Sequence, residues 1–315
     1  MRLVKRNVNI DFMGKRKLAV GLSTVLIVAA LVVLPTMGLN FGLDFTGGTE
    51  VEVRFSEAPE VAEVRESLAG AGMADATVQN FGSSVDLLIR IPPHEGEGEG
   101  EAAAQAEEVI AALQADFPAG VEKRSSGYVG PQVGEELTEQ GILAVIYAMI
   151  GIFVYVMFRF QWRFSVGAVT AIVHDILVTM GILSLLQVDF DLTVVAALLA
   201  VVGYSLNDTI VLFDRIRENF PRMGKASPTE VVNRSVNETL ARTLMTSLTT
   251  LLVLLALFVF GGEIIHAFAL TLIVGVVVGT YSSIYVASNA LLMLGISKLD
   301  LLQVEKEGLE ADPLP

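Results

Sequence analysis

Six long apolar runs interrupt the polar parts of this chain. They cover residues 18–37, 139–158, 164–186, 192–213, 243–261 and 265–294. A helix needs about 20 predominantly apolar residues to cross the hydrocarbon core of a bilayer, whereas helices of soluble domains show only shorter apolar stripes. The pattern therefore predicts a polytopic α-helical membrane protein with six transmembrane helices.

The polar residues between the first two runs, 38–137, show the periodicities of a small folded domain. In chain order they predict a strand at 49–56, a helix at 59–72, a hairpin at Gly82–Ser83, a helix at 101–117 and a strand at 120–129. The order β-α-β-β-α-β is that of a ferredoxin-like unit. We therefore expect a small α+β ferredoxin-like domain between the first and second spans.

A second polar segment, 214–241, is too polar to cross a membrane. Ser227-Pro228 with Glu230 is typical of a helix start. The apolar stripe that follows predicts an amphipathic helix on the membrane surface, with Val231, Val232, Val236 and Leu240. The expected parts are an N-terminal segment and first span at 1–37, the domain at 38–137, a five-helix bundle at 138–294 that includes this connection, and a tail at 295–315.

The basic residues set the expected orientation. Residues 1–17, the turn with Arg159 and Arg163, the 214–242 connection and the tail hold 16 of the 21 lysines and arginines. Segments rich in such residues stay on the cytoplasmic side. We therefore expect both termini in the cytoplasm, residues 38–137 outside, and the first run retained as an anchor rather than cleaved as a signal peptide.

The whole net charge of −14 lies on the outer segment, which has 19 acidic residues against five basic ones. Such a surface argues against nucleic acid or anionic lipid as the ligand of this domain. The acidic loop at 94–101 has low complexity, and we assign it no role. The chain has no cysteine, which excludes disulfides and thiol chemistry.

No motif in the sequence points to catalysis. Gly42, Gly47 and Gly48 do not make a phosphate-binding loop, because no Lys-Ser/Thr pair follows them. The sequence has no metal-ligand cluster, nucleophile triad or nucleotide fingerprint. We therefore do not expect an enzyme, a metal or an organic cofactor.

Asp208 is a carboxylate inside the fourth run, about six residues or about 8 Å from the cytoplasmic end of its helix. A charge that faces lipid costs a few kcal/mol, so Asp208 should face the bundle interior or water. Arg242, at the start of the antiparallel fifth run, reaches the same depth. Taken alone, a structural hydrogen bond explains Asp208 and a snorkelling anchor explains Arg242. Asn207, Tyr204 and Ser205 are placed to hydrogen-bond this carboxylate or to hold water beside it.

Five motifs in one order resemble the SecF family of protein-export membrane subunits. They are "GLDFTGGTEVEV", "VGPQVGEEL", "VGYSLNDTIVLFDRIREN", "RTLMTSLTTL" and "GTYSSIYVASN". The resemblance covers nearly the whole chain, with one span, an outer domain and then five spans. That family belongs to the resistance-nodulation-division superfamily, whose members normally have twelve spans in two similar halves. The resemblance therefore implies that this chain is one half and that SecD supplies the other.

The resemblance implies an accessory subunit of the Sec translocase in the bacterial cytoplasmic (inner) membrane. With SecD, such a subunit uses the proton motive force to promote preprotein translocation, so protons are the coupling ion. The implied partners are SecD, the SecYEG channel, the preprotein and membrane lipid, with no nucleic acid. The proton-relay Asp and Arg of the family fall on Asp208 and Arg242. Two alternatives stay open: a half-transporter for lipids or drugs, and a structural scaffold that moves no proton.

Two further groups of residues inside the spans stand out. His174 and Asp175 lie near the middle of the third run, deeper than Asp208. They either extend a proton path or lock helices together, and the sequence favours neither. The sixth run repeats small residues at Gly275, Gly279 and Ser283, a spacing that lets another helix approach closely.

Overall fold

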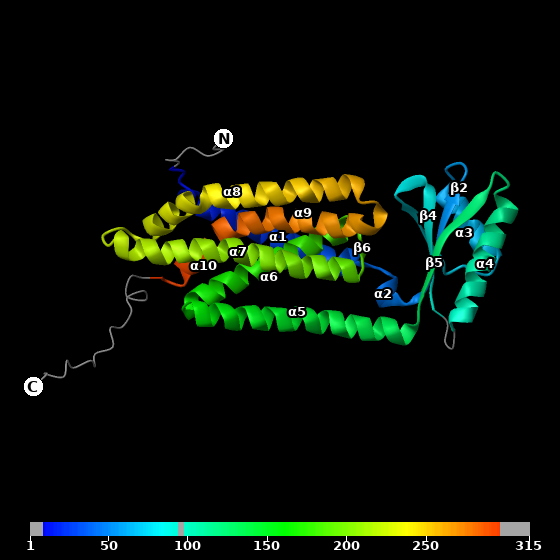
Figure 1. Cartoon of the computed structure of the whole chain (residues 1–315), viewed down its shortest axis with the longest axis horizontal. Helices are drawn as coiled ribbons and strands as arrows, with labels where there is room; N and C mark the ends of the chain where they lie inside the picture. The colour runs from blue at the N-terminus through cyan, green and yellow to red at the C-terminus, as the bar shows by residue number, and fades with distance from the viewer. Residues whose placement is uncertain (1–8, 94–97, 297–315) are drawn as a thin grey trace, which may run out of the picture.

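The computed structural model describes residues 9–93 and 98–296 and has two parts (Figure 1). A bundle of long helices forms one part, and a small α+β domain stands at one end of it. We call this end of the bundle the domain end and the opposite end the far end. The described residues contain six helices long and apolar enough to cross a membrane, which confirms the prediction from the apolar runs.

The six spans keep the order of the apolar runs. They are α1 (Arg16–Met37), α5 (Pro131–Arg159), α6 (Trp162–Leu185), α7 (Leu192–Arg222), α8 (Pro228–Phe260) and α9 (Glu263–Ser282). A short 3-10 turn (Met13–Lys15) precedes α1, and α9 continues through a π-turn (Ser283–Ala287) into α10 (Ser288–Met293). Spans α6 and α7 are the most buried and α5 is the most exposed. The centre of the bundle is therefore built around α6 and α7.

The connection at 214–241 differs from the expected surface helix. Helix α7 continues without a break to Arg222, and α8 already begins at Pro228, behind Ser227, whose side chain caps it. A buried apolar cluster joins the two helix ends, with Ile216, Phe220, Val231, Val232 and Val236. The apolar stripe that predicted contact with a membrane surface thus packs against a neighbouring helix, and the segment forms a helical hairpin instead.

The small α+β domain has the predicted β-α-β-β-α-β order. Its elements are β2 (Gly48–Phe55), α3 (Val61–Gly70), β3 (Thr77–Phe81), β4 (Ser83–Ile91), α4 (Glu99–Asp116) and β5 (Val121–Val129). The strands form one antiparallel sheet in the order β3-β4-β2-β5. The first and third strands of the unit are central, as the ferredoxin-like expectation requires.

The two faces of this sheet have different roles. Along β2, Val51, Val53 and Phe55 are buried in a core that also includes residues of α3 and α4. Successive side chains of a strand point to opposite faces, so Glu50 lies on the other face. There it binds Arg90, whose guanidinium also reaches the bundle. The polar face of the sheet is therefore the one joined to the membrane part.

Two short elements make the junction between domain and bundle. Strand β1 (Asn40–Phe41) pairs in parallel with β6 (Asp189–Phe190), and α2 (Leu43–Thr46) follows β1. Gly47 and Gly48 then have φ angles of +65° and +108°, and a Cβ on Gly48 would lie 2.2 Å from the Ile91 carbonyl oxygen. Only glycine fits there. At this glycine pair the backbone that enters the domain therefore passes very close to the backbone at the end of β4.

Candidate functional site

Asp208 lies on α7, and its side chain is buried with 4% of its surface exposed. Its Oδ2 atom has no hydrogen-bond partner among the described residues. Arg242 lies on α8 and is exposed on the surface of this chain, and its charge acts on the carboxylate. No direct ion pair joins the two within the described part of the chain. Because an unpaired buried carboxylate is costly, Asp208 is set to take a proton, a water molecule or a partner from another chain.

The three neighbours expected to support Asp208 are engaged or exposed instead. The Tyr204 hydroxyl donates to Ser247 Oγ at 3.1 Å, and Ser205 Oγ donates to Asp175 Oδ2 at 2.6 Å. Asn207 is exposed on the outer side of α7. The two hydroxyl protons are thus given to acceptors other than Asp208, because Tyr204 faces Ser247 on α8 and Ser205 faces Asp175 on α6.

Asp175 on α6 is the centre of a buried hydrogen-bond network, with 1% of its surface exposed. Its Oδ2 accepts from Ser205 of α7 at 2.6 Å and from Ser282 of α9 at 2.7 Å. Its Oδ1 lies 2.9 Å from Nδ1 of His174. Three spans therefore meet at one carboxylate, and Ser205 lies less than one helical turn from Asp208.

His174 is as deeply buried as Asp175, with 1% exposure. Since both oxygens of Asp175 serve as acceptors, we assign the shared proton to His174 Nδ1. The other ring nitrogen, Nε2, has no hydrogen-bond partner among the described residues. The ring lies 6.2 Å from that of Tyr281 on α9.

The sequence analysis missed Ser282, Ser247 and Thr280. Ser247 on α8 lies 2.7 Å from Thr280 Oγ1 on α9, and this pair continues the hydrogen bond from Tyr204. Ser282 lies three residues after Gly279, on the same side of the helix, so helical spacing was the signal from which it could have been found. A serine in an apolar span gives no further clue until its partner is known.

The small residues of the sixth run line a close contact between α9 and α7. A Cβ on Gly275 would lie 2.1 Å from Val201 Cγ2, and one on Gly279 would lie 3.1 Å from the Cβ of Ser205. Ser283 starts the π-turn and donates to the Thr280 carbonyl oxygen. The two glycines therefore let α9 come near enough for Ser282 to reach Asp175.

At the domain end, Asp189 joins the sheet to the bundle. Its carboxylate accepts hydrogen bonds from Asn40 at 2.6 Å, from Gln79 at 3.1 Å and from Arg90 at 3.0 Å. The first turn of α7 is held nearby, since its Leu192 amide donates to Asp44 at 3.0 Å. The base of the domain is thus bonded to the start of the helix that carries Asp208.

These features define a class of protein: a multi-pass membrane protein whose central spans carry buried ionisable groups and whose α+β domain is bonded to one of those spans. Such groups mark ion or proton pathways in membrane proteins. No group of three or more metal-binding side chains gathers in the part of the chain that the structure describes.

Comparison with known proteins gives the particular family. The family model "Protein export membrane protein SecD/SecF, C-terminal" matches residues 109–297, and the "SecD/SecF GG Motif" matches residues 32–59, which include Gly47 and Gly48. The chain belongs to the SecD/SecF protein-export membrane protein family.

Relatives support this membership over the full length. The chain is 49% identical to protein translocase subunit SecF of Vibrio alginolyticus, with 100% of this chain and 99% of that one covered. It is 53% identical to the SecF of Magnetococcus marinus, with 93% and 94% covered. The crystal structure of SecDF from Thermus thermophilus, a translocon-associated membrane protein, superposes with a TM-score of 0.81 at 37% identity. That match covers 91% of this chain and 39% of the SecDF chain.

Proposed function

We propose that this chain is the SecF-type subunit of a bacterial protein translocase and that it acts with SecD to use the proton motive force in preprotein translocation. The names of its relatives, which are protein translocase subunits, support this role. The observation that carries the proton step is Asp208, a buried carboxylate with an unpartnered oxygen in the field of Arg242.

The SecD partner is supported by the coverage of SecDF, of which this chain matches 39%. It is also supported by an outward stripe of small and polar residues on α7, namely Thr193, Ala196, Ala200, Gly203 and Asn207. Spans pack closely where such residues recur at helical spacing. SecD supplies the helix that covers this stripe, next to Asp208.

The proposed orientation has both termini in the cytoplasm and the domain outside. The distribution of lysines and arginines supports it, because the far end of the bundle carries most of them. The SecYEG channel and the emerging preprotein are the proposed partners on the outer side, where the domain stands ready to contact a translocating chain.

In the proposed mechanism Asp208 alternates between a protonated and an ionised state. Arginine keeps its proton, so Arg242 serves as a movable counter-charge that favours the ionised carboxylate when it draws near. Each proton that crosses the membrane releases about 2.3 kcal/mol per 100 mV, which is enough to bias a conformational step of a few kcal/mol.

The test replaces the titrating group and keeps its shape. Asp208→Asn should assemble with SecD, because an amide occupies nearly the same space. It should lose the part of preprotein translocation that an imposed proton gradient stimulates, and Arg242→Met should lose it too. The measurement is translocation into proteoliposomes with and without the gradient, and translocation driven by ATP alone should survive both changes.

Two alternative functions give different results. A structural scaffold keeps gradient-stimulated translocation in Asp208→Asn when the complex is present at normal levels. A half-transporter for lipids or drugs shows gradient-dependent transport of small amphiphiles that Asp208→Asn abolishes while translocation is unchanged. Asp214→Asn is the matched control, because Asp214 is partly exposed in the far part of α7 and pairs with Arg159 and Arg217 instead of being buried without a partner.

A further inference from the structure

His174 and Asp175 lie side by side in the middle of α6, and the proposed mechanism does not use them. At least about 15 Å of helix separates Asp175 from either end of α6, which runs from Trp162 to Leu185. Both side chains have 1% of their surface exposed. A carboxylate buried at this depth needs a counter-charge or a proton, because an uncompensated charge in the middle of a membrane is costly.

The helices packed against α6 bring polar but uncharged groups to this carboxylate. Ser205 of α7 and Ser282 of α9 donate their hydroxyl protons to it, and the ring of Tyr281 on α9 lies beside His174. Among the described residues that bond to Asp175, His174 is the one that can carry a positive charge.

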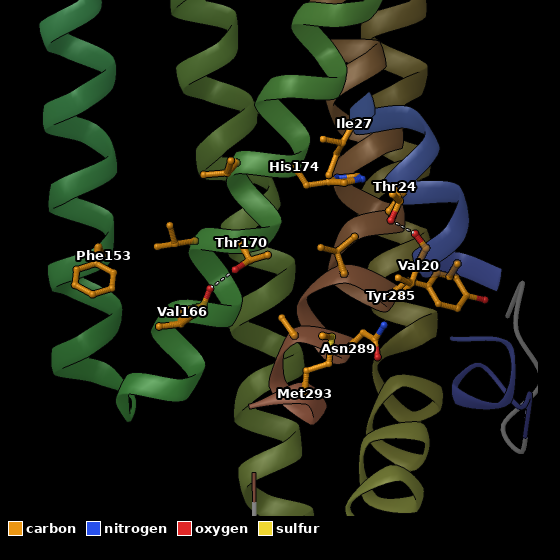
Figure 2. Close-up of a pocket in the computed structure, with 16 residues that line it drawn as sticks. Val20, Thr24, Ile27, Phe153, Val166, Thr170, His174, Tyr285, Asn289 and Met293 are labelled. Atoms are coloured by element: carbon orange, nitrogen blue, oxygen red, sulfur yellow. Dashed lines mark hydrogen bonds between the residues drawn. The ribbon is translucent and has the colours of Figure 1, made fainter. Parts of the chain in front are cut away.

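The other side of His174 has no charged neighbour either. In Figure 2 its side chain points from α6 toward α1, into a cavity of about 460 Å³. Of the described residues in the wall of that cavity, which come from α1, α5, α6, the π-turn and α10, none is a lysine, arginine, aspartate or glutamate. Arg163, which is on α6 itself, lies about 18 Å from Asp175 along the helix. The pair must therefore balance its own charge.

The hydrogen bonds around Asp175 suit an ionised carboxylate. Its Oδ2 accepts two hydroxyl protons, and its Oδ1 lies 2.9 Å from Nδ1 of His174. Hydrogen bonds donated to a carboxylate stabilise its charged form. With a proton on Nδ1 alone, the imidazole is neutral and the site has a full negative charge, whereas an imidazolium makes the pair neutral overall.

The second ring nitrogen of His174 is the atom that can take this proton. Nε2 is buried and has no hydrogen-bond partner among the described residues, so it is not engaged by Asp175 or by a neighbouring helix. A carboxylate beside an imidazole favours the protonated ring. A proton from water that bonds to Nε2 therefore neutralises the site without breaking any hydrogen bond of Asp175.

Ser205 connects this pair to the surroundings of Asp208. It donates to Asp175 at 2.6 Å, and Asp208 follows it by three residues on the same side of α7. The next residue, Thr209, is also buried, and its Oγ1 has no partner among the described residues. Polar atoms on this side of α7 thus extend from the hydrogen bond with Asp175 to the unpartnered oxygen of Asp208.

We propose that His174 and Asp175 form a second proton-binding site, in which the imidazole carries a proton on each nitrogen and Asp175 provides the counter-charge. The negative charge of an ionised Asp208 favours the imidazolium, and a protonated Asp208 does not, so the two sites influence each other. The use of the second site in translocation rests on the proposed function, whereas the proton on His174 does not.

Nitrogen NMR of the full-length chain in lipid bilayers tests the proton on His174 directly. The chain has three histidines, so the double variant His94→Gln/His266→Gln, labelled with ¹⁵N at histidine, reports His174 alone. We expect both ring nitrogens to carry a proton at pH 7. A ring with one unprotonated nitrogen at this pH overturns the proposal.

Asp175→Asn separates the counter-charge from the packing. The amide oxygen can still accept from Ser205 and Ser282, so the melting temperature in mild detergent should change little. The ring of His174 should lose its second proton, because the carboxylate that stabilises the imidazolium is gone. Asp214→Asn, which removes a partly exposed carboxylate of α7, should leave both protons in place. If Asp175→Asn keeps both protons as well, Asp175 is not the counter-charge and the proposal fails.

Translocation into proteoliposomes with SecD tests whether the second site takes part in coupling. His174→Asn keeps an N–H group near the position of Nδ1 but cannot take up a proton. It should lose the gradient-stimulated part of translocation and keep the part driven by ATP alone. If it keeps the stimulated part while Asp208→Asn loses it, the second site is not used and the proposed function stands. If both variants keep it, the proposed function fails together with the coupling role of His174, and the NMR result still decides whether the pair binds a proton.

Discussion

At the scale of single residues, the ion pair between Arg54 and Asp86 in the α+β domain determines the pH range in which the Asp86 carboxyl titrates. Arg54 binds its two oxygens at 2.6 and 2.7 Å, and Ser83 Oγ donates at 2.7 Å. The hydrogen bonds from Arg54, helped by Ser83 and opposed by burial, lower the pKa of Asp86 from 3.8 to about 2. A carboxyl with a lowered pKa stabilises the fold above its ordinary pKa, and that stability is lost as the pH falls through the folded value.

We predict that the domain loses about 1 kcal/mol of stability between about pH 4 and pH 2 from this group, an amount reduced by the half-exposed Arg54. Asp86→Asn should melt lower than the unaltered chain at pH 7 and should lack this part of the pH dependence. Thermal melts of the full chain at stepped pH measure both effects. Asp116→Asn, at the exposed end of α4, is the control. If Asp86→Asn follows the unaltered profile, the ion pair has no stabilising role.

The sequence indicated the surroundings of some residues of the candidate site better than those of others. Asp208 was expected to lie inside the bundle because a carboxylate in an apolar run is costly at the lipid surface, and its side chain is buried. The partners of Asp175 were not found, because they depend on how α6, α7 and α9 are rotated about their axes. Ser282 and Ser283 are adjacent in sequence, yet only Ser282 faces the carboxylate.

At the scale of elements, the close contact between α7 and α9 depends on Gly275 and Gly279, which have no side chain to separate the two helices. Where Gly279 faces Ser205 there is room for a hydrogen atom but not for a branched side chain. Close approach of the two backbones is what allows hydroxyls of both helices to bind one carboxylate on α6. The hydrogen bonds to this carboxylate therefore depend on the close packing of α7 against α9.

We predict that Gly279→Leu destabilises the bundle by about 1–3 kcal/mol or more through overpacking and lowers the yield of folded protein. Gly151→Leu on α5 is the matched control, because a Cβ at Gly151 meets nothing within 4 Å. Yield and melting temperature in mild detergent measure the effect. Equal values for the two variants would show that the contact between α7 and α9 tolerates a large side chain.

Periodicity predicted the elements well and their surroundings less well. The six spans and the domain order follow from apolar length and alternation, which are local properties. The stripe Val231–Leu240 predicted a buried face correctly, but its partner is α7 and not the membrane. An amphipathic pattern predicts that one face of a helix is buried, but it does not indicate whether that face packs against another helix or against the membrane.

At the scale of the whole molecule, Asp189 connects two parts that the sequence shows as separate. Its partners come from the linker after α1, from β3 and from β4, up to 149 residues away in sequence. No local pattern predicts such a set, because it depends on where the domain stands over the bundle. The connection holds the polar face of the sheet against the start of α7.

We predict that Asp189→Asn loosens this junction without unfolding either part. Hydrogen exchange at the amides of Gly42 and Leu192, which are bonded across the junction, should become faster by about tenfold, since a charged hydrogen bond contributes about 1.5–3 kcal/mol. Asp75→Asn, on the exposed side of the domain, should leave both rates unchanged. Unchanged rates in Asp189→Asn would mean that Asp189 does not hold the junction.

Helix α7 joins both ends of this arrangement in one rigid element. Its 31 residues give it a length of about 46 Å, and Asp208 lies about 24 Å from its first turn. A tilt of about 5° around Asp208 displaces the first turn by about 2 Å, enough to break hydrogen bonds of the length found around Asp189. Under the proposed mechanism, a small tilt of α7 about Asp208 that accompanies the uptake of one proton would therefore reach the sheet as a movement whose size is set by the length of the helix between them.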